Sequence, residues 1–382
     1  MKAPEGFLFS AVKCSIKKLD KFDLGLIYSP HKLTAWGVFT KNTVQAAPVV
    51  LGKRLIKGEN LHGVVVNSGV ANACTGEEGI ERAKKLLEEV AKGFKLEPQS
   101  FLPASTGVIG EQLPLEKMLS QVPELLNKLS PDRYLDFTQA IMTTDTFPKI
   151  SYRVLEDGVS ILGIAKGAGM IAPNMATMLG FILTDAKVSK ETLKKLLPKI
   201  VDQSFNRITV DGDTSTNDTV YMLCSNLKDL KNWNHFEKAC LEVAQELAYL
   251  IVKDGEGASK VIKIIIKGAK TKEDAKAFAF SVANSPLVKT AVYGEDANWG
   301  RIFAALGKTG IPFDFEKVEI YLNGLTWIKN LQVITEEEKL RKELQKETVE
   351  LLIKLKEGKK GFEVWTSDFT EEYIKINAHY RT

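Results

Sequence analysis

Histidine and cysteine are scarce in this sequence. Its 382 residues include four histidines and four cysteines, and Cys14, Cys74, Cys224 and Cys240 lie far apart with no CxxC pair. Zinc ribbons, iron–sulfur sites and disulfide frameworks need clustered cysteines, so the spacing argues against all three. With only four histidines, the sequence also offers few candidates for a histidine that activates a nucleophile. We therefore expect a protein with reduced cysteines and no metal centre.

Long apolar runs are also missing. No run approaches the length of about 18 residues that a membrane helix needs. The apolar patch at residues 6–9 is too short for a signal-peptide core, and Lys13 and Lys17 follow it closely. These absences predict a cytoplasmic protein without a membrane partner.

The charge balance argues against a partner that requires a strongly basic surface. Lys and Arg total 52 against 48 Asp and Glu, which gives a net charge of +4. Nucleic acid and anionic membranes need clustered positive charge, so we expect neither as the main partner. The hydrophobic share of 44% and charged share of 26% are typical of globular proteins. The length suits two domains or one large one, and no linker marks a boundary.

Hydrophobic periodicity predicts an α/β (α+β) fold, with mixed or antiparallel sheets and helices outside them. Helices are expected at residues 80–91, 190–197 with Ser189 as N-cap, 236–252, and from a Thr335–Glu338 capping box to about residue 357. Strands are expected at residues 62–67, 159–165, 181–183, 261–266, 277–282 and 318–322.

The stretch from Lys166 to Gly180 is mostly small and apolar. Gly167, Gly169 and Ala172 fit G-x-G-x-x-A, with Asp185 near the acidic position, but no helical stripe follows as a dinucleotide loop requires. Composition alone favours a tightly packed core strand and turn.

A third interpretation makes Thr177 a nucleophile. A threonine that becomes N-terminal by chain cleavage can use its own α-amine as base, so it needs no histidine. The small Ala176 leaves its carbonyl open to the Thr177 hydroxyl, so the bond between them is a plausible cleavage site.

Other segments offer binding groups. Thr106 and Gly107 can present a hydroxyl and a backbone N–H to an oxyanion. The oxygens of residues 211–218 suit Mg²⁺ or Ca²⁺, although a self-bonded turn is the plainer interpretation. Binding loops or ordinary turns are possible at residues 143–146, 254–257 and 294–301.

Taken together, these residues resemble the glutamate N-acetyltransferase (ornithine acetyltransferase) family of arginine biosynthesis. The resemblance spans nearly the whole chain, through residues 67–69, 105–110, 143–146, 166–180, 204–218, 254–257, 284–290, 294–301 and 377–382. One departure is Val70, where the family often has Asn. It changes a loop neighbour and no catalytic residue.

The resemblance implies a layered α/β sandwich of mixed β-sheets covered by helices. It also implies self-cleavage between Ala176 and Thr177 into an α chain, 1–176, and a β chain, 177–382. Thr177 would be the nucleophile, and Thr106 with Gly107 the oxyanion pair. The implied substrate contacts are Thr143, Lys166, Thr177, Glu256, Asn377 and Thr382. No cofactor or metal is implied, and the two chains would associate as a heterotetramer of two α and two β.

The implied reaction is ping-pong transfer of acetyl from N-acetylornithine to glutamate through an acetyl-Thr177 ester. Some family members also take acetyl from acetyl-CoA, and the sequence leaves this open. Three alternatives remain: a self-cleaving aminopeptidase or amidase of similar architecture, a non-catalytic amino-acid-binding protein, and a nucleotide-dependent oxidoreductase.

Overall fold

The computed structural model describes residues 2–17, 20–172 and 178–379. The chain divides into two units that each have their own core. The first unit comprises Met1–Asn206 and Asp213–Ile251, and the second comprises Arg207–Gly212 and Val252–Thr382. The predicted cleavage point falls inside the first unit, so the predicted α and β chains are not the two units.

In the first unit, eight strands of the described residues form one mixed sheet in the order β4-β3-β2-β8-β7-β6-β5, with β1 paired to β2. The pairs β3–β4 and β7–β8 are parallel and the others antiparallel. The strands are β1 Leu8–Val12, β2 Leu24–Phe39, β3 Leu61–Asn67, β4 Phe101–Ser105, β5 Lys149–Val154, β6 Ser160–Lys166, β7 Leu179–Ala186 and β8 Thr219–Lys228.

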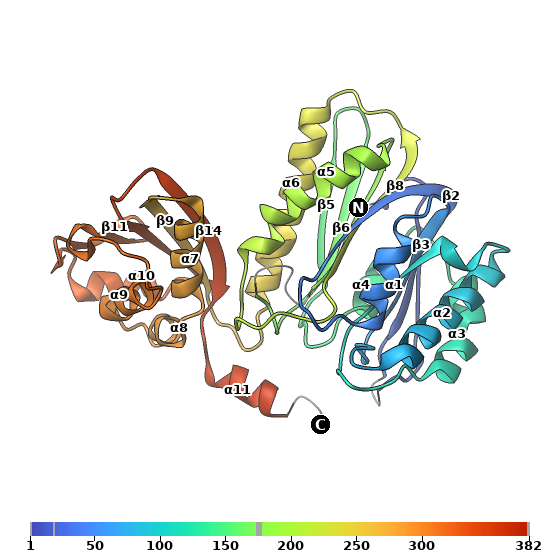
Figure 1. Ribbon diagram of the computed structural model, residues 1–382, viewed down its shortest axis with the longest axis horizontal. Helices are drawn as coiled ribbons and strands as arrows, with labels where there is room; N and C mark the ends of the chain where they lie inside the picture. The colour runs from blue at the N-terminus through green and yellow to red at the C-terminus, as the bar shows by residue number, and fades with distance from the viewer. Residues whose placement is uncertain (1, 18–19, 173–177, 380–382) are drawn as a thin grey trace. The chain divides into compact units, whose positions relative to one another are not determined.

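Helices cover both faces of this sheet. They are α1 Ala47–Leu55, α2 Gly76–Gly93, α3 Leu115–Asn127, α4 Tyr134–Ala140, α5 Lys190–Asp202 and α6 Trp233–Lys253 (Figure 1). Side chains alternate along a strand, and β6 shows the result. Leu162 and Ile164 join a buried cluster with Phe137 of α4. Gly163 faces the other way, where an added Cβ would lie 2.4 Å from Val243 of α6.

The second unit has its own six-stranded mixed sheet among the described residues, in the order β12-β11-β10-β13-β9-β14. Its strands are β9 Val261–Ala269, β10 Glu319–Leu322, β11 Leu325–Lys329, β12 Gln332–Val333, β13 Thr348–Lys354 and β14 Lys360–Ser367. Its helices are α7 Lys272–Ala283, α8 Pro286–Tyr293, α9 Trp299–Gly307, α10 Glu337–Leu344 and α11 Glu371–Ala378. Helix α7 lies against β9 and β14 (Figure 1).

Short 3₁₀ turns complete the described elements, at Pro98–Ser100 (η1), Phe205–Arg207 (η2) and Phe315–Lys317 (η3). No helix in the described part of the chain combines the length and apolar character needed to cross a membrane.

Most expected elements are confirmed, including the mixed sheets with helices on their faces. The Ser189 hydroxyl caps α5 by accepting the Thr192 N–H. The expected strands near residues 62–67, 159–165, 181–183, 261–266 and 318–322 correspond to β3, β6, β7, β9 and β10. The strand expected at 277–282 is wrong, because those residues belong to α7, which a capping box between Thr271 and Asp274 opens.

The long helix expected from Thr335 to about residue 357 is also wrong. Helix α10 ends at Leu344, and residues 348–354 form β13, which pairs in parallel with β9. The Thr335 hydroxyl donates to the Thr326 carbonyl instead of capping the helix. Leu351 and Leu355 are buried as expected, but Val349 and Ile353 are buried with them. Burial at every second residue is the period of a strand, which a stripe of leucines alone did not reveal.

The strand predicts unequal costs for two adjacent substitutions. Ile353 is fully buried, whereas Leu352 points to the half-buried face of β13. We expect Ile353→Ala to lower the free energy of unfolding by about 2–5 kcal/mol. Leu352→Ala should lower it by about 1 kcal/mol, because less apolar surface is lost from the core. Urea denaturation of both variants measures the difference, and equal losses would contradict the strand register.

Candidate active site

The turn after β4 holds the predicted oxyanion pair. Thr106 N–H donates to the Asn67 carbonyl over 3.0 Å, and Val108 N–H donates to the Gly69 carbonyl over 3.2 Å. Gly107 lies between them with φ +130°, and a Cβ there would lie 2.3 Å from the Gly69 carbonyl carbon. Glycine is therefore required at this position. The Gly107 N–H makes no hydrogen bond to a described residue, which leaves it available to an oxyanion.

Lys166, the last residue of β6, joins the Thr106 turn to the segment after α4. Its side chain is 3% exposed. Its Nζ donates to Thr143 Oγ1 over 2.7 Å and to Thr106 Oγ1 over 3.3 Å. An ammonium group only donates, so both threonine hydroxyls are acceptors here. Each hydroxyl keeps its own proton for donation to a substrate oxygen or an oxyanion.

A fully buried carboxylate, Asp145, holds this arrangement together. Its Oδ1 accepts from Lys149 Nζ over 2.7 Å and from Gly167 N–H over 2.7 Å. Its Oδ2 accepts from Thr143 N–H over 3.0 Å and lies 3.7 Å from Lys166 Nζ. Asp145 thus fixes the backbone of the predicted site residue Thr143 and of Gly167, which follows Lys166, and it attracts the side-chain charge of Lys166.

The electrostatics of Asp145 follow from these contacts. Burial acts to raise the pKa of its carboxyl, but the charges of Lys166 and Lys149 and the hydrogen bonds from Lys149 and Thr143 outweigh burial. The pKa of Asp145 therefore lies well below its ordinary value, and the group is a carboxylate at neutral pH.

The loop before β8 forms hydrogen bonds to the backbone next to the Thr106 turn. Asn217 Nδ2 donates to the carbonyls of Ala71 and Ser105 over 2.6 and 2.9 Å. Asp218 Oδ1 accepts the Met178 N–H over 3.0 Å. The alternative of a Mg²⁺ or Ca²⁺ loop gains no support, because Asp211 accepts from the Tyr373 hydroxyl and Asp218 faces Met178. Within the described ranges, no group of three or more metal-ligating side chains is placed to hold an ion.

In the second unit, two of the predicted substrate contacts lie together. Asn377 Nδ2 on α11 donates to Glu256 Oε2 over 2.8 Å. Gly257 has φ +68°, and an added Cβ would lie 2.5 Å from Tyr373 N, so only glycine allows α11 this close. The Thr370 hydroxyl donates to the Gly257 carbonyl over 2.6 Å and also caps α11. The 254–257 loop is thus a docking turn for α11.

The structure therefore gathers Thr106, Gly107, Thr143 and Lys166 in the first unit, and Glu256 with Asn377 in the second. Ala176, Thr177 and Thr382 lie outside the described residues. Val70, the departure from the family pattern, uses its backbone: its carbonyl accepts from Asn67 Nδ2, and it bridges Thr106 and Val108.

Sequence reasoning singled out residues 143–146 and 211–218 as loops but missed the special part of Asp145, Lys149 and Asn217. The signal for Asp145 and Lys149 was an acid and a lysine four residues apart, which is common in any sequence. Burial of both side chains, which gives the pair its importance, is visible only in the fold.

The dinucleotide-loop interpretation of Gly167, Gly169 and Ala172 fails. Strand β6 is followed by β7, its antiparallel neighbour, with Lys166 opposite Leu179. The fingerprint requires a strand that leads into a helix. Asp185 is also occupied, because it accepts from the Ser160 N–H and the Lys228 ammonium.

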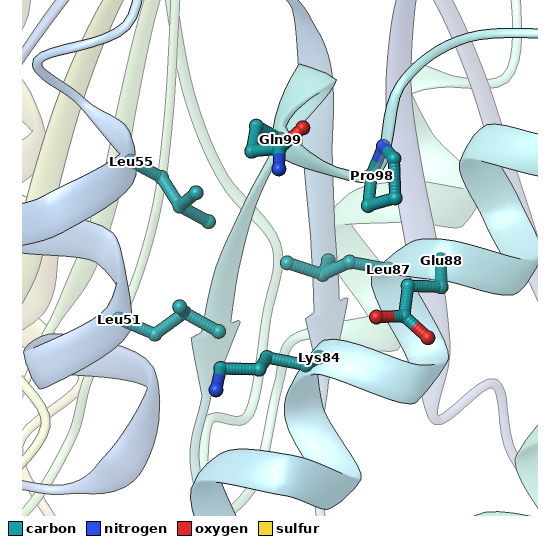
Figure 2. Close-up of a pocket in the computed structure, with 7 residues that line it drawn as sticks. All are labelled: Leu51, Leu55, Lys84, Leu87, Glu88, Pro98 and Gln99. Atoms are coloured by element: carbon teal, nitrogen blue, oxygen red, sulfur yellow. The ribbon is translucent and has the colours of Figure 1, made fainter.

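A cavity of about 420 Å³ opens beside the cluster. Its lining includes Thr143 and Asp145, together with Lys21, whose Nζ donates to the Met142 carbonyl over 3.1 Å. A smaller pocket of about 120 Å³ lies between α1, α2 and η1 (Figure 2). It is lined by Leu51, Leu55, Lys84, Leu87, Glu88, Pro98 and Gln99, none of which is a predicted site residue. Of these two cavities, the larger one therefore adjoins the cluster around Asp145.

Comparison with known proteins places the sequence in a family. The ArgJ family model matches residues 8–382. The chain is 45% identical over 400 residues to the arginine biosynthesis bifunctional protein ArgJ of Thermotoga neapolitana, with all of both proteins covered. The chain belongs to the ArgJ family. It is also 43% identical to ArgJ of Bacillus subtilis, across 100% of this chain and 96% of that protein.

A crystal structure of ArgJ from Bacillus halodurans matches with a TM-score of 0.51 and 38% identity. The match covers 53% of this chain and 99% of the other. The resemblance drawn from the motifs is thus confirmed: this ArgJ-family chain is an acetyltransferase of arginine biosynthesis.

The buried cluster predicts the effect of neutralising its carboxylate. Asp145→Asn in this ArgJ-family chain leaves two buried ammonium groups without their carboxylate, so we expect a loss of about 3–5 kcal/mol in the free energy of unfolding. Asp20→Asn is the control, because the Asp20 side chain is 90% exposed and forms an ion pair with Lys13 at the surface. It should cost about 1 kcal/mol at most. Urea denaturation at pH 7 compares them.

The sign of the pH dependence follows from the lowered pKa. Near the ordinary carboxyl pKa of 3.8, the Asp145 side chain binds fewer protons in the folded state than in the unfolded state. The stability that Asp145 contributes is therefore complete above about pH 5 and is lost as the pH falls further. The difference in stability between wild type and Asp145→Asn should shrink below that pH. A constant difference would contradict an ionised Asp145.

Proposed function

We propose that this ArgJ-family chain cleaves itself between Ala176 and Thr177 and transfers acetyl from N-acetylornithine to glutamate through Thr177. The observation that carries the proposal is the arrangement around Lys166. One cation orients two threonine hydroxyls as donors, next to a Gly107 N–H that has no described partner. Stabilising an oxyanion needs preorganised donors of this kind.

Cleavage would give an α chain, 1–176, and a β chain, 177–382. The match to the Bacillus halodurans structure supports this, since nearly all of that chain corresponds to only about half of this one. Both products would hold parts of the first unit, because β6 and β7 are paired along their length across the cleavage point. The chains should therefore stay associated after cleavage, and we propose a heterotetramer of two α and two β.

In the first half-reaction, the Thr177 α-amine takes the proton of the Thr177 hydroxyl, whose oxygen attacks the acetyl carbonyl carbon of N-acetylornithine. The Thr106 hydroxyl and Gly107 N–H donate to the oxyanion. Its collapse breaks the C–N bond, the α-amine returns the proton to the leaving nitrogen, and ornithine departs. The acetyl group remains as an ester on Thr177.

In the second half-reaction, the amine of glutamate attacks the ester carbonyl. The same two donors stabilise the second oxyanion. Collapse breaks the bond to the Thr177 oxygen, the Thr177 α-amine passes to that oxygen the proton that the glutamate nitrogen loses, and N-acetylglutamate leaves. No organic cofactor or metal enters either half-reaction. Use of acetyl-CoA as a second donor would form the same acetyl ester with a thiol as leaving group.

The charged residues suit amino-acid substrates. Lys166 can pair with a substrate carboxylate, and Thr143 can donate its remaining proton to the same group. Glu256 can pair with a substrate amine, and Asn377 holds its Oε2 in place. Thr177 and Thr382 complete the proposed contacts. We place this reaction in the cytoplasm, where the free cysteines Cys14, Cys74, Cys224 and Cys240 would stay reduced.

A self-cleaving aminopeptidase or amidase is the second candidate, since it would share the nucleophile and the oxyanion donors. It would hand the acyl group to water. Incubation with N-acetylornithine and glutamate separates the two by product: N-acetylglutamate supports the transferase, and free acetate alone supports the hydrolase. A binding protein would remain one chain and yield neither.

Thr177→Ala tests the proposal directly. The variant lacks the hydroxyl that both cleavage and transfer use, so we expect one uncut chain of 42.3 kDa and no measurable N-acetylglutamate. Wild type should give two fragments that match 1–176 and 177–382 by intact mass under denaturing conditions. Acetyl transfer by the variant, or an uncut wild type, would overturn the proposal.

Gly107→Ala tests the oxyanion pair against a matched control. The added Cβ would collide with the Gly69 backbone and displace the N–H, whereas Gly110 has φ +88° with nothing within 4 Å of an added Cβ. We expect Gly107→Ala to lower kcat for acetyl transfer by about 100-fold or more. Gly110→Ala should retain most of the activity, because it carries only the strain of a positive φ. Equal losses would remove Gly107 from the proposed role.

A further inference from the structure

Asn217 is a buried residue to which neither half-reaction assigns a part, although its side chain binds the backbone beside Thr106. It lies in the loop before β8 and is 5% exposed. Its Nδ2 carries two protons, and it donates to the Ser105 carbonyl over 2.9 Å and to the Ala71 carbonyl over 2.6 Å. One side-chain amide thus joins two backbone segments that are far apart in the sequence.

The orientation of the Asn217 amide follows from its surroundings. Its Oδ1 accepts the Thr216 hydroxyl over 2.6 Å, and its backbone N–H donates to Ser215 Oγ over 3.0 Å. Its carbonyl accepts the Thr219 hydroxyl over 3.0 Å. A flipped amide would place Oδ1 against two backbone carbonyl oxygens, which can only accept, so the donors face the carbonyls. Every polar group of Asn217 therefore has a partner, and the side chain has one orientation.

The first of the two bonds fixes the peptide group that leads into Thr106. The Ser105 carbonyl of that group accepts from Asn217, and its Thr106 N–H donates to the Asn67 carbonyl over 3.0 Å. The next peptide group carries the Gly107 N–H. Because a peptide group is planar, holding both polar atoms of one group leaves only the two Thr106 backbone torsions to set the direction of the next. Asn217 therefore restricts both predicted oxyanion donors.

The second bond fixes the segment that faces this turn. The Ala71 N–H donates to the Val108 carbonyl over 2.9 Å, and the Val108 N–H donates to the Gly69 carbonyl over 3.2 Å. Gly107 packs so closely on this segment that an added Cβ would lie 2.3 Å from the Gly69 carbonyl carbon. Asn217 binds the backbone on both sides of this contact, so its amide holds the two segments at the separation that Gly107 requires.

We propose that Asn217 is a positioning residue for acetyl transfer, whose side-chain amide fixes the Thr106 hydroxyl and the Gly107 N–H where the oxyanion forms. This inference rests on the proposed function, because it presupposes that these two groups stabilise the oxyanion. Asn217 acts through the backbone and forms no bond to the substrate. The oxyanion exists only along the reaction path, so losing the amide should lower kcat and leave KM nearly unchanged.

Asn217→Ala and Asn217→Leu test the role of the amide. Alanine removes both donors and the volume of the side chain, whereas leucine removes the donors and keeps a similar volume. We expect each variant to lower kcat for acetyl transfer, per cleaved chain, by at least about 10-fold, with KM for N-acetylornithine within about twofold of wild type. A packing role predicts that Asn217→Leu keeps most of the activity, and that result would overturn the proposal.

Asn226→Ala is the matched control. The Asn226 side chain, on β8, donates to Thr34 Oγ1 over 2.9 Å and accepts the Val188 N–H over 3.3 Å. Its φ of +61° means that alanine also adds backbone strain there. This variant should lose stability to urea, as Asn217→Ala does, but keep kcat within about twofold of wild type. A similar loss of kcat in both variants would attribute the effect to destabilisation and would overturn the positioning role.

Binding of a tetrahedral analogue tests the donors without turnover. The probe is ornithine whose α-nitrogen carries a methylphosphonyl group, so that a tetrahedral phosphorus with a charged oxygen replaces the acetyl carbonyl carbon. Asn217→Leu should weaken binding of this probe at least about 10-fold by calorimetry, and binding of ornithine, which lacks the group, by less than about twofold. Equal weakening of both ligands would overturn the proposal.

The outcomes distinguish this inference from the proposed function. Wild type that makes no N-acetylglutamate, or Gly107→Ala that keeps full activity, would overturn the proposed oxyanion pair itself. If both behave as expected, Asn217→Ala and Asn217→Leu that match wild type in kcat would overturn the positioning role alone. Asn217 variants that stay uncut while Asn226→Ala cleaves would assign Asn217 to folding or self-cleavage, which also overturns a role in transfer.

Discussion

The site depends on one buried carboxylate that is shared by two lysines. Asp145 binds Lys149 directly and attracts Lys166 from 3.7 Å, while its two oxygens also accept the backbone N–H groups of Thr143 and Gly167. A buried charge is tolerated only when it is paired and hydrogen-bonded, and this one meets both conditions. The position of Lys166, and through it the orientation of the Thr106 and Thr143 hydroxyls, follows from that requirement.

Two glycines show how backbone approach sets the rest of the geometry. Gly107 lets the turn after β4 press against Gly69, and Gly257 lets α11 press against the 254–257 loop. In each case an added Cβ would meet backbone atoms, which cannot rotate away as a side chain can. The first close approach exposes an N–H to the site, and the second brings Asn377 to Glu256. A glycine that allows close backbone approach thus positions the Gly107 N–H in the first unit and the Glu256 carboxylate in the second.

Sequence reasoning reached the mixed sheets because β-branched runs such as Val64–Val66 bury on both faces and leave a strong local signal. It failed between Thr335 and residue 357, where a leucine spacing compatible with a helix concealed a strand whose stability comes from pairing with β9, more than 80 residues earlier. The site shows the same limit. Sequence motifs identified Thr106, Gly107, Thr143 and Lys166. They could not show that Lys166 donates to both threonine hydroxyls, because that contact arises from tertiary packing. No local pattern distinguishes Asp145 from an exposed aspartate.

The carboxyl pKa values of the two acids near Lys166 are shifted in opposite directions, and the contrast has a chemical consequence. Asp145 is surrounded by donors and two ammonium groups, which lower the pKa of its carboxyl, whereas complete burial outweighs the weaker compensation at Asp218 and raises the pKa of that carboxyl. When Asp218 carries its proton, the side chains of Lys149, Lys166, Asp145 and Asp218 have one net positive charge together. When Asp218 is ionised as well, the four side chains are neutral together. A neutral Asp218 would leave a positive charge for a substrate carboxylate or a developing oxyanion to neutralise, which would link the protonation of one buried acid to the anion binding that we propose for this site.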